Sequence, residues 1–181
     1  MLINNIEMKK IIYSAAAILS SFLFMGCPYE ANFGLETTPA NKFPTELTGD
    51  YEEETTSENP KLYKITKDND YVAAISEIKN KGKDDEETTY YKAFVTKIDS
   101  LEFLSLRELN SDNTEKEEPK YYFYKIVRKS SGIKVKLHPV TDNITETFNS
   151  SDELKAFFKK HGGLSFFYDN DDIKKFVKSE D

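Results

Sequence analysis

Residues 121–140 read YYFYKIVRKSSGIKVKLHPV, and this stretch decides the fold class. From Ile133 to His138 apolar residues alternate with lysine or histidine, which is the period of a β-strand with one buried and one wet face. The run before it, Tyr121 to Lys129, carries aromatic residues on both faces of a strand. Residues 130–132, Ser-Ser-Gly, are a turn signal between the two runs. The stretch therefore predicts an antiparallel hairpin.

Short strands separated by polar turns extend this pattern over most of the chain. The expected strands are residues 49–55, 61–67, 71–78, 90–98, 101–109, 121–129 and 133–140, with a weaker stretch at 144–148. A spacing of about 8–12 residues with mostly short turns is typical of an antiparallel sandwich or barrel. A parallel α/β sheet would need helical crossovers, for which the chain has no room. We expect an all-β protein built as an antiparallel meander.

One helix is expected near the C-terminus. Ser150 and Glu153 form a capping box, in which the serine side chain and the glutamate three residues later satisfy free backbone N–H groups. A mostly apolar stripe follows at helical spacing and consists of Leu154, Phe157, Phe158 and His161. Gly162 is expected to end the helix. A last apolar group, residues 173–177, is expected to form the final strand.

The N-terminal residues 1–26 have the parts of a secretory signal peptide. Lys9 and Lys10 precede an apolar run of about 15 residues, which is shorter than the roughly 20 that a membrane-spanning helix needs. An uncleaved transmembrane anchor is the alternative. Met8 is the better start, because residues 1–7 add net negative charge and no signal feature, but Met1 stays open.

The signal ends in Leu23-Phe24-Met25-Gly26-Cys27, which resembles the lipobox of bacterial lipoproteins. The resemblance implies that Cys27 is lipidated with diacylglycerol and acyl chains such as palmitate. The chain would then be anchored to a membrane of the cell envelope without a spanning helix. Pro28 stands where inner-membrane lipoproteins carry aspartate, so the resemblance favours the outer membrane.

The chain divides into the signal peptide, residues 27–45 and a single domain, residues 46–181. Residues 27–45 hold the lipidated cysteine and proline, asparagine and threonine without periodicity, so we expect a flexible tether. Cys27 is the sole cysteine, and its lipidation leaves no thiol for a disulfide, a metal or a nucleophile. The formal net charge of −7 argues against nucleic acid as a partner.

The domain opens with Leu47-Thr48-Gly49-Asp50-Tyr51, continues as a meander of about eight strands, and ends with one helix and a strand. This order resembles a lipocalin-like β-barrel, and also small bacterial envelope lipoproteins that open with a Gly-x-aromatic strand. The resemblance covers roughly residues 47–177. Lipocalins carry tryptophan where this chain has Tyr51, and the chain contains no tryptophan. The resemblance implies a barrel that can hold a small apolar ligand.

Aromatic residues on two of the expected strands suggest where such a ligand would lie. We expect the inward members of residues 90–95 and 121–124 to line a cavity for an apolar or amphipathic molecule, and we choose Tyr91, Tyr121 and Phe123. The alternative is a barrel filled with side chains, as in a structural or protein-interaction lipoprotein of the envelope.

The other polar clusters predict no catalysis and no cofactor. Residues 169–172, Asp-Asn-Asp-Asp, could bind calcium but lack the glycine and distal glutamate of an EF-hand, and such residues also form ordinary turns. His138 and His161 are the two histidines, and no nucleophile motif accompanies either. We expect a protein that is not an enzyme and has no metal site.

Overall fold

Eight antiparallel strands close into a barrel in the computed structural model, which describes residues 28–56, 58–128 and 134–179. The elements in chain order are β1 (Glu30–Ala31), the 3₁₀ helix η2 (Thr45–Leu47), β2 (Gly49–Glu53), β3 (Leu62–Lys67), β4 (Ala73–Lys79), β5 (Glu87–Ile98), β6 (Leu101–Glu108), β7 (Tyr121–Arg128), β8 (Lys134–Pro139), the α-helix α2 (Ser151–His161), the 3₁₀ helix η3 (Ser165–Phe167) and β9 (Lys174–Lys178). Each strand from β2 to β8 pairs with the next, and β9 pairs with both β8 and β2. The expected all-β meander with one C-terminal helix is confirmed.

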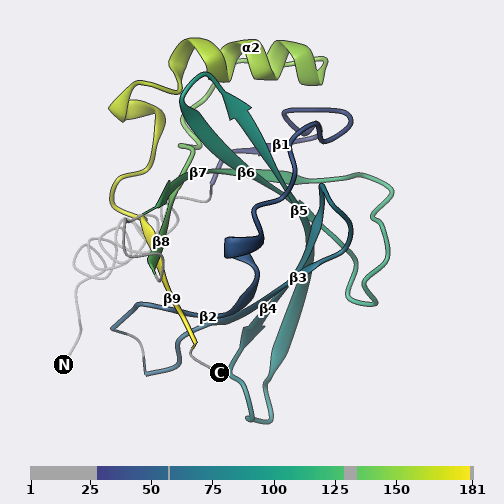
Figure 1. Ribbon diagram of the computed structural model, residues 1–181, viewed down its shortest axis with the longest axis vertical. Coiled ribbons are helices and arrows are strands. Elements are labelled where there is room, and N and C mark those ends of the chain that lie inside the picture. The colour runs from purple at the N-terminus through teal and green to yellow at the C-terminus, as the bar shows by residue number, and fades with distance from the viewer. Residues whose placement is uncertain (1–27, 57, 129–133, 180–181) are drawn as a thin grey trace, which may run out of the picture.

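The barrel is seen as a ring in Figure 1, with η2 in the middle of the ring and α2 across one side. Neighbouring strands hold a register that keeps apolar side chains together on one face. Leu104 of β6, for example, lies opposite Val95 of β5 and Tyr124 of β7. The alternation seen in the sequence therefore sorts side chains into an inner core and an outer core.

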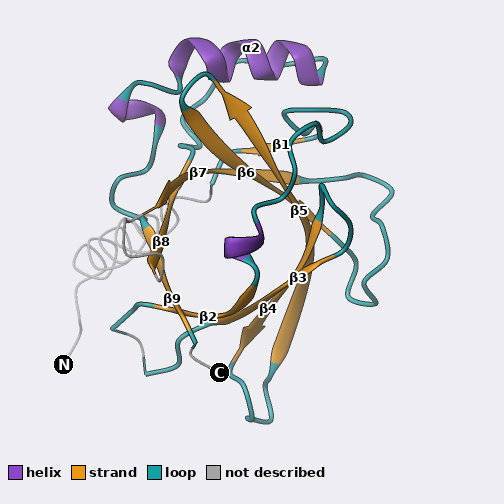
Figure 2. Ribbon diagram, viewed as in Figure 1, coloured by secondary structure: helices purple, strands orange, loops and turns teal. Residues whose placement is uncertain are grey.

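The inner core lies inside the barrel and contains Phe43, Leu47, Ala73, Ile75, Ala93, Val95, Leu104 and Ile126. The outer core lies on the outside of β5, β6 and β7, where Phe103 and Phe123 are fully buried. The helix α2 covers this outer face (Figure 2) and packs Phe158 between those two rings, at centroid distances of 5.3 and 5.2 Å. The sheet therefore buries both of its faces over these strands.

The helix begins and ends where the sequence predicts. Ser150 Oγ accepts a hydrogen bond from the Glu153 N–H at 3.2 Å, and the Glu153 carboxylate accepts from the Asn149 N–H at 2.9 Å. Gly162 ends the helix with an ordinary right-handed backbone, φ −62°. Glycine is favoured at this position because a larger residue would not fit: a Cβ there would lie 2.9 Å from the Phe103 ring.

Two expectations about connecting segments are wrong. Residues 28–45 are not a tether along the described part: β1 pairs with the start of β7, and Leu35 is fully buried in the outer core. Residues 144–148 form no strand; Phe148 packs instead on Phe157 of the helix at 5.0 Å. The eighth strand of the barrel is β9, because its residues complete the pairing between β8 and β2.

Candidate functional site

A cavity of about 380 Å³ lies inside the barrel. This volume falls within the roughly 300–1,000 Å³ that is typical of small-ligand sites. Its apolar wall is formed by inward side chains of β3, β4, β6, β7, β8 and β9, namely Ile65, Ile75, Leu104, Leu106, Ile126, Val135, Leu137 and Phe176. Alternate residues of each strand reach this wall, so the two-residue period of the sequence forms the site directly.

Five tyrosines border the cavity. Tyr51 of β2 is buried, and the other four, from three strands, add hydroxyl groups to the apolar wall: Tyr63, Tyr91, Tyr122 and Tyr124. All four point into the barrel but are only half-buried, because they border the cavity. Burial, together with nearby carboxylates such as Glu77, raises the pKa of Tyr63 and of Tyr91. The raised pKa keeps the O–H proton of both phenols, which is a hydrogen-bond donor, and Tyr63 hydrogen-bonds the Glu77 carboxylate.

One end of the barrel is closed by the segment that contains η2. Phe43 and Leu47 are buried there and border the cavity. The Tyr51 hydroxyl donates to the Glu46 carbonyl oxygen at 3.1 Å, and Arg128 of β7 pairs with the Glu46 carboxylate. These contacts fix η2 across the barrel end.

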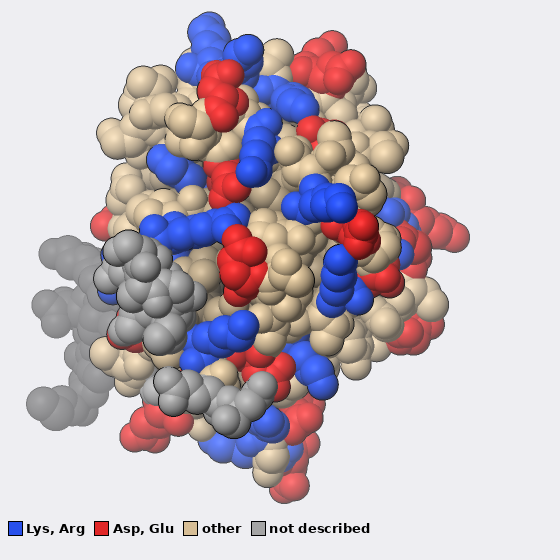
Figure 3. All heavy atoms as spheres, viewed as in Figure 1, with Lys and Arg blue, Asp and Glu red and all other residues tan. Residues whose placement is uncertain are grey.

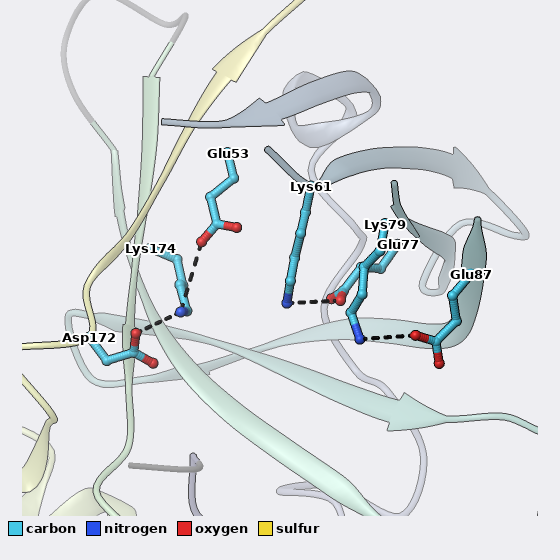
Figure 4. A network of polar contacts seen from close by, with 7 residues as sticks. All are labelled: Glu53, Lys61, Glu77, Lys79, Glu87, Asp172 and Lys174. Atoms are coloured by element: carbon cyan, nitrogen blue, oxygen red, sulfur yellow. Dashed lines mark hydrogen bonds and ion pairs between the residues drawn. The ribbon is translucent and has the colours of Figure 1, made fainter. Parts of the chain in front are cut away.

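The opposite end is polar, and we call it the charged mouth (Figure 4). It is formed by Glu53, Lys61, Glu77, Lys79, Glu87, Asp172 and Lys174. Lys174 lies 2.6 Å from the Asp172 carboxylate and 3.8 Å from that of Glu53. Lys61 pairs with Glu77 at 3.0 Å, and Lys79 pairs with Glu87 at 3.4 Å. The cavity thus runs from a closed apolar end to an end that carries charges of both signs.

The three residues that the sequence suggested for ligand binding are separated by the structure. Tyr91 lines the cavity. Tyr121 and Phe123 do not, because they lie on the outside of β7: Phe123 packs against Phe158 of the helix, and Tyr121 against Phe94. The choice of face on β7 was wrong by one residue, and a shift of one residue exchanges the two faces of a strand.

Sequence reasoning missed the tyrosines on the inner face of β7, Tyr122 and Tyr124. A signal for them existed in the hairpin of residues 121–140. Leu137 of β8 is inward and lies opposite Ile126, which places Ile126, Tyr124 and Tyr122 on the same inner face. All four residues 121–124 are aromatic, so both faces of the strand looked apolar and the sequence pattern did not show which face is inward.

The remaining polar candidates lie outside the cavity or at its rim. His138 of β8 is half-buried against the Tyr168 ring at 6.3 Å, and burial followed by Lys125 and Lys136 lowers the pKa of its imidazole. The His161 ring packs at a tilt against the Phe157 ring, with centroids 4.4 Å apart. Asp169 accepts a hydrogen bond from the Asp171 N–H at 3.0 Å, as in an ordinary Asx turn. Among the residues that the structure describes, no group of three His, Cys, Asp or Glu side chains is arranged to hold a metal ion.

Charged side chains of both signs are interspersed over the face of the molecule seen in Figure 3. Cys27, the expected lipidation site, lies outside the described residues. Within residues 28–56, 58–128 and 134–179, no helix is long and apolar enough to cross a membrane. Comparisons with family models, with curated proteins and with solved structures gave no match.

Proposed function

We propose that the protein is a non-catalytic, lipid-anchored lipoprotein of the cell envelope whose lipocalin-like barrel binds one small amphipathic molecule. The observation that carries this proposal is the cavity, which combines an apolar wall, four tyrosines and a charged mouth. A barrel of about eight strands either fills with side chains or holds one small ligand, and about 380 Å³ of space supports the second outcome.

The arrangement of the lining favours an amphipathic ligand over a uniformly apolar one. An apolar chain beside Leu104, Leu106 and Ile75 would gain about 25 cal/mol for each Å² that it removes from water. A polar head at the charged mouth would stay solvated and meet Lys61 or Lys174, which avoids the cost of burying an unpaired polar group.

Attachment to the membrane follows from Cys27 in this proposal. Two or more acyl chains anchor a protein stably, at about 0.8 kcal/mol per buried CH₂ group. Metabolic labelling with radioactive palmitate tests it: the natural chain should incorporate label, and Cys27→Ser should incorporate none and remain unprocessed or soluble. Equal labelling of both forms would contradict lipidation at Cys27.

The binding proposal is tested by titrating an environment-sensitive fluorescent fatty acid into a soluble form that begins at residue 27 and carries Cys27→Ser. We expect saturable binding of one probe per chain. Leu106→Trp fills the cavity from β6 and should abolish binding. Leu164→Trp makes the same change at a side chain that is 40% exposed, and should leave binding unchanged.

Two results would count against a ligand-binding barrel in this experiment. One is no saturable binding to the soluble form, which would favour a structural or protein-interaction role. The other is equal binding to both tryptophan variants, which would place the probe outside the cavity. Circular dichroism of each variant shows that it has folded.

A further inference from the structure

Pro28 connects the position of the lipid anchor with the position of the cavity. It is the first described residue, it follows Cys27 directly, and it borders the cavity. Consecutive Cα atoms are about 3.8 Å apart, so a lipid on Cys27 is attached one residue from the cavity lining.

The chain after Pro28 is fixed to the barrel without slack. The Tyr29 N–H donates to the Val140 carbonyl oxygen at 2.9 Å, and the Tyr29 ring stacks on Phe123 at 6.1 Å. Glu30 then pairs with Tyr122 at the start of β7, and its carboxylate lies 2.9 Å from the Lys120 ammonium group. The chain is therefore fixed to the barrel from Tyr29 onward, two residues after the expected anchor point.

The start of β7 belongs to the end of the barrel that carries the charged mouth. Tyr122 lines the cavity there, and its hydroxyl contacts Glu108 at 3.1 Å at the end of β6. The closed end lies at the other end of these strands, where Arg128 ends β7 and pairs with Glu46 beside η2.

We infer that the lipid anchor holds the charged mouth against the membrane surface, so that the barrel takes up a single-chain lipid directly from the bilayer. This inference rests on both parts of the proposed function, the lipidation of Cys27 and the ligand cavity. The acyl chain of the captured lipid lies along Leu106 and Ile126, and its head group remains at Lys61 and Lys174. The ion pairs of the mouth carry both signs, so the covalent anchor and not surface charge sets this orientation.

Orientation is measured on lipidated protein reconstituted into phosphatidylcholine vesicles. Asp171→Cys places a single thiol beside the charged mouth, and Thr45→Cys places one on η2 at the closed end; both positions are exposed. Each thiol is labelled with a small fluorophore, and the vesicles contain a quencher attached to lipid. We expect strong quenching at position 171 and weak quenching at position 45, with the same ratio in high salt. Equal quenching, or stronger quenching at position 45, would overturn the orientation.

The source of the ligand is measured by transfer of a fluorescent lysophospholipid from donor vesicles. Lipidated protein should load faster than the Cys27→Ser form, by on the order of tenfold, because the anchor raises the effective concentration of bilayer lipid at the mouth. Lipidated Leu106→Trp should not load.

The outcomes separate this inference from the proposed function. Binding by both forms at equal rates would overturn uptake from the bilayer and leave the cavity as a ligand site. If neither form binds the lysophospholipid or the fatty acid, the proposed function itself is contradicted. Palmitate labelling independently reports whether the anchor is present.

Discussion

Thr96 and Ser105 are polar residues whose burial in the outer core lowers the stability of the fold. Both side chains are fully buried between the barrel and its covering segments, and neither hydroxyl has a hydrogen-bond partner within the described structure. A buried hydroxyl without a partner costs about 1–3 kcal/mol. Both positions lie on the outer face of β5 and β6, the same face as Phe103.

Thr96→Val keeps the shape of the side chain and removes the unpaired hydroxyl. It should raise the free energy of unfolding by about 1 kcal/mol. Thr66→Val is the matched control, since Thr66 of β3 is exposed, and should change stability little. Urea unfolding of the two variants and the parent measures this, and a lower stability of Thr96→Val would show that its hydroxyl has a partner.

Tyr63, which lines the cavity, makes the stability of the folded protein depend on pH in the alkaline range. Burial, followed by the carboxylates of Glu77 and Glu53, raises the pKa of its hydroxyl above the usual value of about 10. Above that pH an unfolded chain loses the proton while the folded chain keeps it, so the folded state binds more protons and stability falls as pH rises.

Tyr63→Phe removes this titration and should flatten the loss of stability above about pH 10. Tyr71→Phe, at an exposed side chain, is the control and should follow the parent. Thermal unfolding between neutral and alkaline pH measures the slopes. Parallel slopes for parent and Tyr63→Phe would contradict a raised pKa at Tyr63.

Individual residues of the site could be predicted from the sequence only where apolar and polar residues alternate, because the alternation shows which face of the strand is inward. Val135 and Leu137 alternate with lysines and a histidine, and both line the cavity. The four aromatic residues 121–124 offered no such contrast, so their inward members had to come from the register with Leu104 and Leu106. Register relates two strands, so residues 121–124 taken alone do not contain it, and the signal lies in the pairing with the following strand, where Ile126 is opposite Leu137.

At the scale of elements, α2 is the cover of the outer core. Phe158 is fully buried and contacts the rings of Phe103, Phe123 and Phe167 at 5.0–5.3 Å. Phe157, one position earlier, is half-buried, and its ring packs at a tilt against the rings of Phe148 and His161. The helix therefore presents the Phe158 side to the barrel.

Phe158→Ala should lower the free energy of unfolding by about 3–5 kcal/mol, because it leaves a cavity between the helix and β6–β7. Phe157→Ala should cost less, and Ser150→Ala about 1 kcal/mol through the lost capping bond. Denaturant unfolding ranks the three variants. Equal and small losses from both phenylalanines would mean that the helix does not dock on the barrel.

The N-terminal segment, residues 28–45, is a structural element and not a tether. Leu35 is fully buried against the outer core, and a Cβ on Gly34 would lie 2.8 Å from the Phe94 ring. Leu35→Ala should cost about 2–5 kcal/mol, whereas truncation in a flexible tether would cost nothing. Chemical unfolding measures the difference, and a parent-like midpoint would support the tether.

The sequence predicted most strands and the helix to within a few residues because each has its own period. β6 and β7 start at the expected residues, and the Ser150 cap forms as expected. It did not predict the role of residues 28–45. Apolar residues alternate from Tyr29 to Leu35, but the run is short, and the burial of Leu35 and Phe43 depends on distant strands.

For the whole molecule, the meander and its closure decide what the protein can do. Pairing of β9 with β2 and β8 closes strands β2 to β9 into a ring and encloses the interior. The sequence indicates such a barrel but not whether its interior is filled, because that depends on how far Tyr91, Tyr124 and their neighbours reach across it. The structure leaves about 380 Å³ there, and this space is the basis of the proposed function.

Native mass spectrometry of the Cys27→Ser form with a single-chain fatty acid tests the presence of a ligand-binding cavity most directly. One ligand should bind per chain of the parent and of Leu164→Trp, and none should bind to Leu106→Trp, whose new side chain occupies the space. Absence of the one-to-one complex from the parent, or its equal abundance in Leu106→Trp, would contradict a ligand site inside the barrel.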